Sequence, residues 1–202
     1  MRYLLFFALL LFANLVSSQD NFDKSIEDFR KNYLKEFLAN ERAPLKDEEA
    51  LSHMRFFDAD ENYKVTASFE KTPKAKPFDM PTFSGINKPY VQYGWLTFKI
   101  DGKEHKLALY QNLKLRVVPQ YRDYLFLPFK DKTNANGTYG GGRYIDVKKS
   151  EIRDGKMVLD FNKAYNPWCA YADGYSCPIP PTDNHLLVEI LAGEKEYGKS
   201  KY

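Results

Sequence analysis

Apolar side chains between residues 22 and 40 recur at steps of three, four and one. This spacing places them on one face of an α-helix. Pro44 disfavours helical angles at the residue before it and so marks the end of the segment. We therefore predict a helix over residues 22–40 that packs its apolar face on the rest of the protein. A membrane-surface helix is the alternative, although Glu27, Asp28 and Glu36 make its polar face mixed rather than basic.

The period of the apolar pattern changes to two after residue 60. Residues 63–69 alternate apolar with polar side chains, which predicts a strand. Residues 93–100 and 106–110 flank Asp101-Gly102. Asp-Gly between two such runs is typical of a hairpin, because both residues of its turn take a positive φ.

The rest of the chain predicts further short strands. Residues 124–129 form one, and residues 144–147 and 157–161 flank Asp154-Gly155, a second hairpin signal. Residues 185–192 (HLLVEILA) form the last strand. About seven short strands separated by glycine turns predict a mainly β fold, an antiparallel barrel or sandwich preceded by one α-helix.

Residues 1–18 have the organisation of a secretory signal peptide. A single charge at Arg2 precedes the apolar residues 3–13, and small residues follow at the expected cleavage point. The apolar run is shorter than the about 20 residues that span a bilayer, although an uncleaved anchor helix is the alternative. We expect an exported protein, periplasmic or secreted, with no membrane span in its mature chain. Residues 19–44 would then be the N-terminal helix and connection, and residues 45–202 a single β-rich domain.

Composition limits the classes of function. Of the 202 residues, 44% are hydrophobic and 28% are charged, as in a globular domain. A net charge of +3 is too small for a nucleic-acid-binding surface. Two cysteines and three histidines leave little room for metal chemistry, so we expect no metal and no cofactor. Aromatic residues make up 16% of the chain, enough both to fill a core and to line a pocket.

Three consecutive glycines, residues 140–142, stand directly before Arg143. Glycine lets another group approach the backbone closely, and an arginine can bind a carboxylate or phosphate with two parallel hydrogen bonds. The residues around the glycines match neither a phosphate loop nor a calcium loop. The segment is therefore either an anion site or a long hairpin loop whose arginine pairs with Asp131 or Asp146.

A second unusual segment, residues 160–185, combines amides, carboxylates and aromatic rings between prolines. Prolines hold such a loop rigid, and convergent polar groups among rings are typical of a ligand pocket. Because Asn162 follows the end of a strand, we expect its side chain to point into the mouth of a cleft. We predict that Arg143 and Asn162 share one concave site. Its ligand-binding residues would be Arg143, Asp131, Tyr139, Tyr144, Asn162, Tyr165, Asn166 and Asn184.

Cys169 and Cys177 stand eight positions apart in this second segment. In an exported protein the leading interpretation is a disulfide, which would restrict the unfolded chain by about 2.5 kcal/mol on the entropic model. A zinc site is the alternative, with His185 as the nearby histidine. A nucleophilic cysteine is a third interpretation, but no Cys-His motif supports it.

The two segments together resemble an uncharacterised bacterial family, the domain of unknown function 1684 family. The resemblance covers roughly residues 60–196, with Trp168 and Asp183 as two small departures from its pattern. It implies no known activity. The residues that carry it lie in 125–133 (LFLPFKDKT), 138–146 (TYGGGRYID), 160–170 (DFNKAYNPWCA), 177–181 (CPIPP), Asn184 and 192–195 (AGEK).

Three functions remain open at this point. The first is binding of a small polar or anionic ligand, with Arg143 as the anchor. The second is a hydrolase-like enzyme with Asp131 or Asp160 as the general base, although the common catalytic motifs are absent from the sequence. The third is a structural or interaction module. A cleft that holds Arg143 beside a carboxylate would favour an enzyme, whereas a fully paired Arg143 without a cavity would favour scaffold. The pattern leaves the oligomeric state open.

Overall fold

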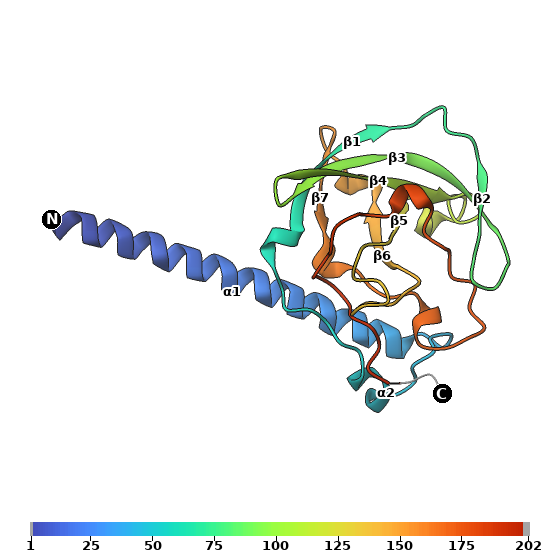
Figure 1. Ribbon diagram of the computed structural model, residues 1–202, viewed down its shortest axis with the longest axis horizontal. Helices are drawn as coiled ribbons and strands as arrows, with labels where there is room; N and C mark the ends of the chain where they lie inside the picture. The colour runs from blue at the N-terminus through green and yellow to red at the C-terminus, as the bar shows by residue number, and fades with distance from the viewer. Residues whose placement is uncertain (1, 200–202) are drawn as a thin grey trace.

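A curled antiparallel sheet forms the body of the protein, and the C-terminal part of a long N-terminal helix lies against it (Figure 1). This computed structural model describes the backbone of residues 2–199 and the side chains of residues 19–199. The sheet has seven strands in the order β6-β5-β4-β3-β1-β7, with β2 paired to β3, and is a half-barrel. The mainly β fold with an N-terminal helix is confirmed. The helices are α1 (Arg2–Ala39) and α2 (Glu48–Ser52), and the strands are β1 (Lys64–Lys71), β2 (Phe78–Met80), β3 (Lys88–Ile100), β4 (Lys103–Asn112), β5 (Tyr124–Phe129), β6 (Arg143–Lys148) and β7 (Lys156–Asp160).

The hairpin at Asp101-Gly102 is confirmed. Its two residues have φ angles of 50° and 73°, and β3 pairs with β4 from the first residues after this turn. Both strands are long and meet along most of their length, which makes this hairpin the centre of the sheet. One face of the sheet is the core. Its fully buried side chains include Leu96, Leu107, Leu109, Leu125, Leu127 and Leu159.

Helix α1 packs as its periodicity predicts. Phe22, Ile26 and Phe37 are buried, while Glu27, Asp28 and Glu36 remain exposed. The Phe37 ring meets the edge of Tyr171 at a centroid distance of 5.5 Å. The expected signal peptide, residues 1–18, lies outside the residues whose side chains the structure describes. Among the described residues, no helix combines the length and the apolar character needed to cross a membrane.

The Asp154-Gly155 turn forms, but the hairpin that we predicted around it is wrong. Both turn residues have a positive φ, and Arg153 pairs with Lys156 across them. Strand β6, however, pairs with β5, and β7 pairs with β1 at the opposite edge of the sheet. The turn reverses a short connection rather than joining two neighbouring strands.

The prediction of a last strand at residues 185–192 is also wrong. This segment makes a single parallel bridge from His185 to Lys130 and then leaves the sheet. Its later carbonyl groups, at Ile190 and Ala192, accept hydrogen bonds from the side chain of Arg143. Because a side chain rather than a neighbouring strand takes up these backbone groups, the apolar pattern is that of an extended loop in which every second side chain faces the interior.

Candidate functional site

Arg143 begins strand β6 and is fully buried. Its Nη2 donates to Asp131 Oδ2 at 2.8 Å and to the Ile190 carbonyl at 2.9 Å. Its Nη1 donates to the carbonyl groups of Ala192 and Glu194. Burial lowers the pKa of the guanidinium, and the charge of Asp131 opposes that shift. The arginine thus holds the segment after residue 185 onto the sheet, and although its Nε has no partner among the described residues, these contacts favour a scaffold role.

Asn162, which we predicted to share a concave site with Arg143, is likewise buried. Its Oδ1 accepts from the Asp60 backbone N–H at 2.9 Å, and its Nδ2 donates to the Asp60 carbonyl at 2.8 Å and to Asp160 Oδ1 at 3.0 Å. The side chain therefore ties the chain before β1 to the end of β7. Neither Asn162 nor Arg143 lines the cleft described below.

Asn184 fills a gap between β4 and β5. The two strands are paired at Tyr110 and Phe126, and Pro128 of β5 has no N–H with which to continue that ladder. The Asn184 amide takes its place: Oδ1 accepts from the Ala108 N–H at 2.7 Å, and Nδ2 donates to the Ala108 carbonyl at 2.9 Å and the Pro128 carbonyl at 2.6 Å. The asparagine is thus a structural substitute for strand backbone.

Glu194 and Asn166 form a second buried polar group beside Arg143. Glu194 Oε2 accepts from the Asn166 N–H at 2.9 Å, and Oε1 accepts from the Tyr171 hydroxyl. Burial raises the pKa of Glu194 to about 7, against the lowering effect of these two donors. The Asn166 Nδ2 donates to the Lys195 carbonyl at 2.8 Å. This buried carboxyl was not singled out from the sequence, because nothing in its local pattern marks it as buried.

Other residues of the protein itself pack against the three glycines before Arg143. A Cβ at Gly141 would lie 2.3 Å from the Tyr139 ring, and one at Gly142 would lie 2.7 Å from the Phe129 carbonyl. Tyr139 is half-buried, packs near the Phe83 ring at 6.3 Å and is outside the cleft. The inference that a group approaches these glycines therefore holds, but that group is part of the fold.

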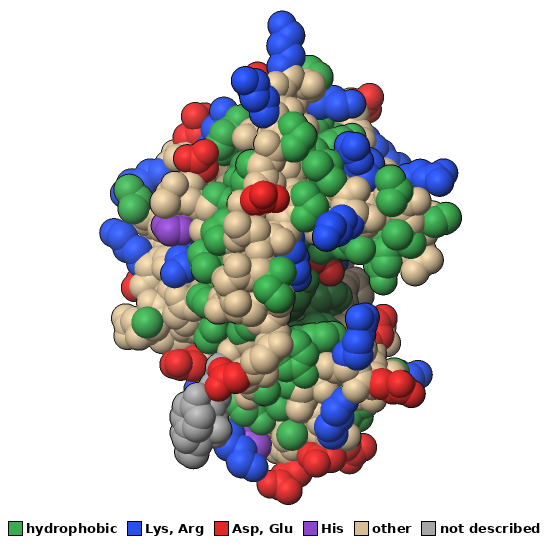
Figure 2. Space-filling view, turned by 90° about the vertical axis from the view of Figure 1, so that its right-hand side faces the viewer, with side chains coloured by type: hydrophobic (Ala, Val, Ile, Leu, Met, Phe, Trp, Pro, Cys, Tyr) green, Lys and Arg blue, Asp and Glu red, His purple; other side chains and the backbone are tan. Residues whose placement is uncertain are grey.

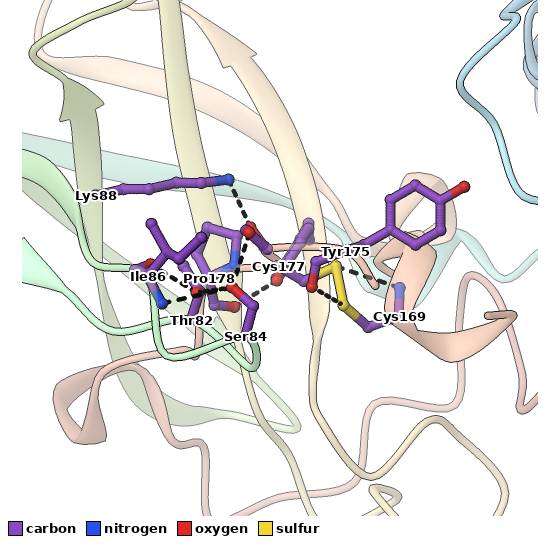
Figure 3. Close-up of a disulfide and its surroundings, with 10 residues drawn as sticks. Thr82, Ser84, Ile86, Lys88, Cys169, Tyr175, Cys177 and Pro178 are labelled. Atoms are coloured by element: carbon purple, nitrogen blue, oxygen red, sulfur yellow. Dashed lines mark hydrogen bonds between the residues drawn. A yellow bond between two sulfur atoms is a disulfide. The ribbon is translucent and has the colours of Figure 1, made fainter. Parts of the chain in front are cut away.

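The disulfide between Cys169 and Cys177 is present (Figure 3). The segment that it closes is also bonded to the first residue of β3 and to the loop before it. Lys88 Nζ donates to the Ser176 carbonyl at 2.5 Å, and Ser84 Oγ donates to Ser176 Oγ at 2.7 Å. The Phe83 N–H donates to the Cys177 carbonyl at 3.1 Å. The crosslink and these bonds hold the segment as a firm wall.

A cleft of about 850 Å³ opens between α1, the sheet and this wall. Figure 2 shows a hollow in the molecular surface with a largely hydrophobic floor and charged side chains at its edge. The volume falls within the usual range of small-molecule sites. The lining residues are Phe29, Asn32, Tyr33, Glu36, Phe37, Asn40, Lys88, Tyr90, Tyr124, Phe126, Tyr144, Ile145, Asp146, Lys163, Tyr165, Pro167, Trp168, Tyr175, Ser176, Cys177 and Pro178.

Strand alternation explains why β6 contributes to the cleft. Ile145 and Val147 point into the core, so Tyr144 and Asp146 point to the opposite face of the sheet. Phe126 on β5 stands directly across from Asp146 and joins the same face. The face of the half-barrel away from the core therefore presents two rings and one carboxylate to the space beneath α1.

Aromatic rings form an unbroken series around the cleft. From α1, Tyr33 contacts Tyr165 at a centroid distance of 5.9 Å, and Tyr165 contacts Tyr144 at 5.9 Å. Tyr144 continues to Phe126 at 4.7 Å, and Phe126 to Tyr90 at 5.8 Å. A second branch runs through Phe37, Trp168 and Tyr175. Edge-to-face and tilted contacts of this kind fix ring orientation, so the walls are largely preformed.

Asp146 is the carboxylate that faces this space. Its Oδ1 accepts from the Tyr165 hydroxyl at 2.7 Å and the Tyr124 hydroxyl at 2.9 Å. Burial within the walls raises the pKa of Asp146, and the two tyrosine donors oppose the shift. The side chain is nevertheless exposed to the cleft, and among the described residues its Oδ2 has no hydrogen-bond donor. Asp146 therefore offers one free acceptor oxygen to a ligand.

Of the expected site residues, the structure places Tyr144 and Tyr165 in the cleft and Arg143, Asp131, Tyr139, Asn162, Asn166 and Asn184 outside it. Sequence reasoning considered Asp146 only as a partner for Arg143. The alternation of polar and apolar residues along 143–148 did contain the signal, because it sets Asp146 on the same face as Tyr144.

The fold and the cleft define a class of half-barrel β protein whose helix covers an aromatic cleft. A family of proteins of unknown function, DUF1684, matches residues 49–195, so this chain belongs to that family and the resemblance read from its sequence is confirmed. The chain is also similar to an uncharacterised protein of Haloarcula marismortui solved by NMR in solution, with 31% identity and a TM-score of 0.62 over 86% of this chain and 97% of that one. No curated protein matches the chain.

Proposed function

We propose that this protein is exported and that it binds a small polar ligand in the aromatic cleft. The observation that carries the proposal is Asp146 in a ring-lined cavity of about 850 Å³: Tyr124 and Tyr165 donate to its Oδ1, and no described residue donates to its Oδ2. Apolar walls with one oriented polar group are typical of sites that bind a small molecule and fix its orientation. The ligand would pack on the rings and place its polar group at Asp146.

The residue that would anchor the ligand is Asp146, whereas the sequence suggested Arg143. Arg143 is committed to Asp131 and to three backbone carbonyl groups, so an anion finds no free guanidinium there. Positive charge near the cleft comes from Lys88 and Lys163 instead. The proposed general bases, Asp131 and Asp160, lie outside the cleft and are hydrogen-bonded within the fold. Binding is therefore favoured over hydrolysis by either residue.

A thermal-shift screen with a metabolite library tests the proposal when two tryptophan variants are included. Asn32 and Lys35 are both exposed positions of α1, but only Asn32 lines the cleft. Asn32→Trp should fill the cleft, whereas Lys35→Trp is the matched control. A compound that stabilises the wild type and Lys35→Trp but not Asn32→Trp supports the proposal. Compounds that stabilise all three equally bind elsewhere and would contradict it.

A further inference from the structure

The charged groups that line the cleft are not equivalent. Lys88 directs its ammonium group to the Ser176 carbonyl at 2.5 Å, and the Lys163 ammonium lies over the Phe29 ring at 5.5 Å from the centroid. Glu36 is exposed on α1. Asp146, by contrast, stands among the rings with one oxygen unused by the described residues. Both ammonium groups thus have a contact within the protein, whereas Asp146 keeps an oxygen among the rings that no described donor uses.

The rings around Asp146 favour the same sign of charge. The faces of tyrosine and tryptophan rings are electron-rich and attract a cation within about 6 Å of their centroids. Tyr165 and Tyr124 are held at the carboxylate by their hydroxyl groups, and Tyr144 and Tyr33 contact the Tyr165 ring. A cation bound at Asp146 would thus meet a carboxylate that stands among tyrosine rings.

The walls also decide which kind of cation fits. A metal ion needs several oxygen or nitrogen ligands, whereas the nearest neighbours of Asp146 are phenol rings whose hydroxyl groups already donate to it. An organic ammonium ion presents C–H groups to the rings and needs a single counter-charge. Because the carboxylate has lost part of its hydration, such an ion would interact with it more strongly than in water.

We propose that the ligand of the cleft is an organic cation, an alkylated amine or quaternary ammonium ion, whose positive head sits between Asp146 and the tyrosine rings. This inference rests on the proposed function of the cleft and specifies the chemical class of its ligand. The rings would supply the contact surface, and Asp146 would select for positive charge.

Titration calorimetry with choline and with 3,3-dimethylbutan-1-ol, in which a neutral carbon replaces the choline nitrogen, tests the proposal on the full chain. Choline should bind at least about tenfold more tightly than the isostere, as expected where a cation–π contact adds to the attraction of a carboxylate. Asp146→Asn should remove that difference while leaving binding of the isostere unchanged. Asp79→Asn, an exposed position on β2 outside the cleft, should behave as the wild type.

Two results would overturn the inference. One is equal binding of choline and the isostere, and the other is an Asp146→Asn variant that binds choline as the wild type does. Either result, together with a library compound that Asn32→Trp excludes, leaves the proposed binding function standing and rejects only the cation. Failure of every compound to distinguish Asn32→Trp from Lys35→Trp rejects both.

Discussion

At the scale of single residues, the buried arginine shows how a functional motif and a scaffold motif can share one pattern. Arg143 carries its charge into the interior, where Asp131 and three carbonyl groups surround it. An arginine after a run of glycines would look the same at an exposed anion site. Burial decides between the two interpretations, and burial depends on the segment after residue 185, which lies far away in sequence.

Replacing Arg143 by methionine should lower the free energy of unfolding by about 3–5 kcal/mol, because it leaves the Asp131 carboxylate buried without its counter-charge. Urea unfolding followed by circular dichroism measures this loss. The exposed Arg116→Met variant serves as the control. A change below about 1 kcal/mol in Arg143→Met would contradict the scaffold role.

Glu194 should make the stability of the protein depend on pH. Its pKa in the folded protein is raised to about 7 from an ordinary value of 4.5, so the folded state holds a proton that the unfolded chain releases. Stability therefore falls as the pH rises from about 4.5 to 7 and is level above that range. The shift corresponds to a loss of about 3 kcal/mol from this group.

In Glu194→Gln the amide oxygen can accept from the Asn166 N–H while the amide nitrogen donates to the Tyr171 hydroxyl, so the contacts persist without a titrating group. Urea unfolding at pH 5, 6, 7 and 8 should show a flatter profile for this variant than for the wild type. Parallel profiles would show that Glu194 does not titrate in this range.

At the scale of elements, turns were predicted better than the strands that they connect. Both Asp-Gly turns form, because their positive φ angles are a local property of the two residues. Which strands then pair is not local: β7 leaves its turn and pairs with β1, whose Lys64–Ser68 lie opposite Asp160–Lys156. Residues 185–192 have the composition of a strand, yet Arg143 and Asp131 occupy their backbone groups.

The loop that precedes β6 offers a matched pair of glycine substitutions. Gly142 and Gly137 both have positive φ angles, 95° and 112°, so alanine is strained at either. A Cβ at Gly142 would also lie 2.7 Å from the Phe129 carbonyl, whereas one at Gly137 meets nothing within 4 Å.

Gly137→Ala should therefore cost about 1 kcal/mol from backbone strain alone, and Gly142→Ala should cost clearly more because the Phe129 backbone must also move. Thermal unfolding of the two variants measures the difference. Equal losses would mean that β5 yields to the added methyl group and that the close packing of this loop is unimportant.

At the scale of the whole molecule, the cleft could not be predicted because three distant parts of the chain build it. Helix α1 supplies Tyr33, β6 supplies Asp146, and the disulfide-closed segment supplies Tyr175. Each part was predicted in its own right as a helix, a strand and a crosslinked loop. Their relative placement depends on the curl of the sheet and on how α1 lies beneath it, which no local pattern contains.

The described contacts of α1 lead to a prediction about the mature chain. Phe22 is the first buried side chain among those described in the helix, and residues 19–21 are exposed. A chain that begins at Gln19, the expected product of cleavage, should unfold within about 0.5 kcal/mol of the full chain. A chain that begins at Asn40 is the control and should be strongly destabilised, because it loses Ile26 and Phe37. A lower midpoint for the chain from Gln19 would contradict the expected cleavage site.

The acceptors of the Arg143 guanidinium impose an order on biosynthesis. The arginine leaves the ribosome 47 residues before Ile190, and the three carbonyl groups that surround it belong to a segment made after every strand of the sheet. Until that segment arrives, closing β6 over the interior would bury a charge with too few acceptors, at a cost of several kcal/mol. We therefore expect the nascent chain to complete its fold only after this segment has been made. The same buried charge that secures the finished fold is thus expected to delay its completion.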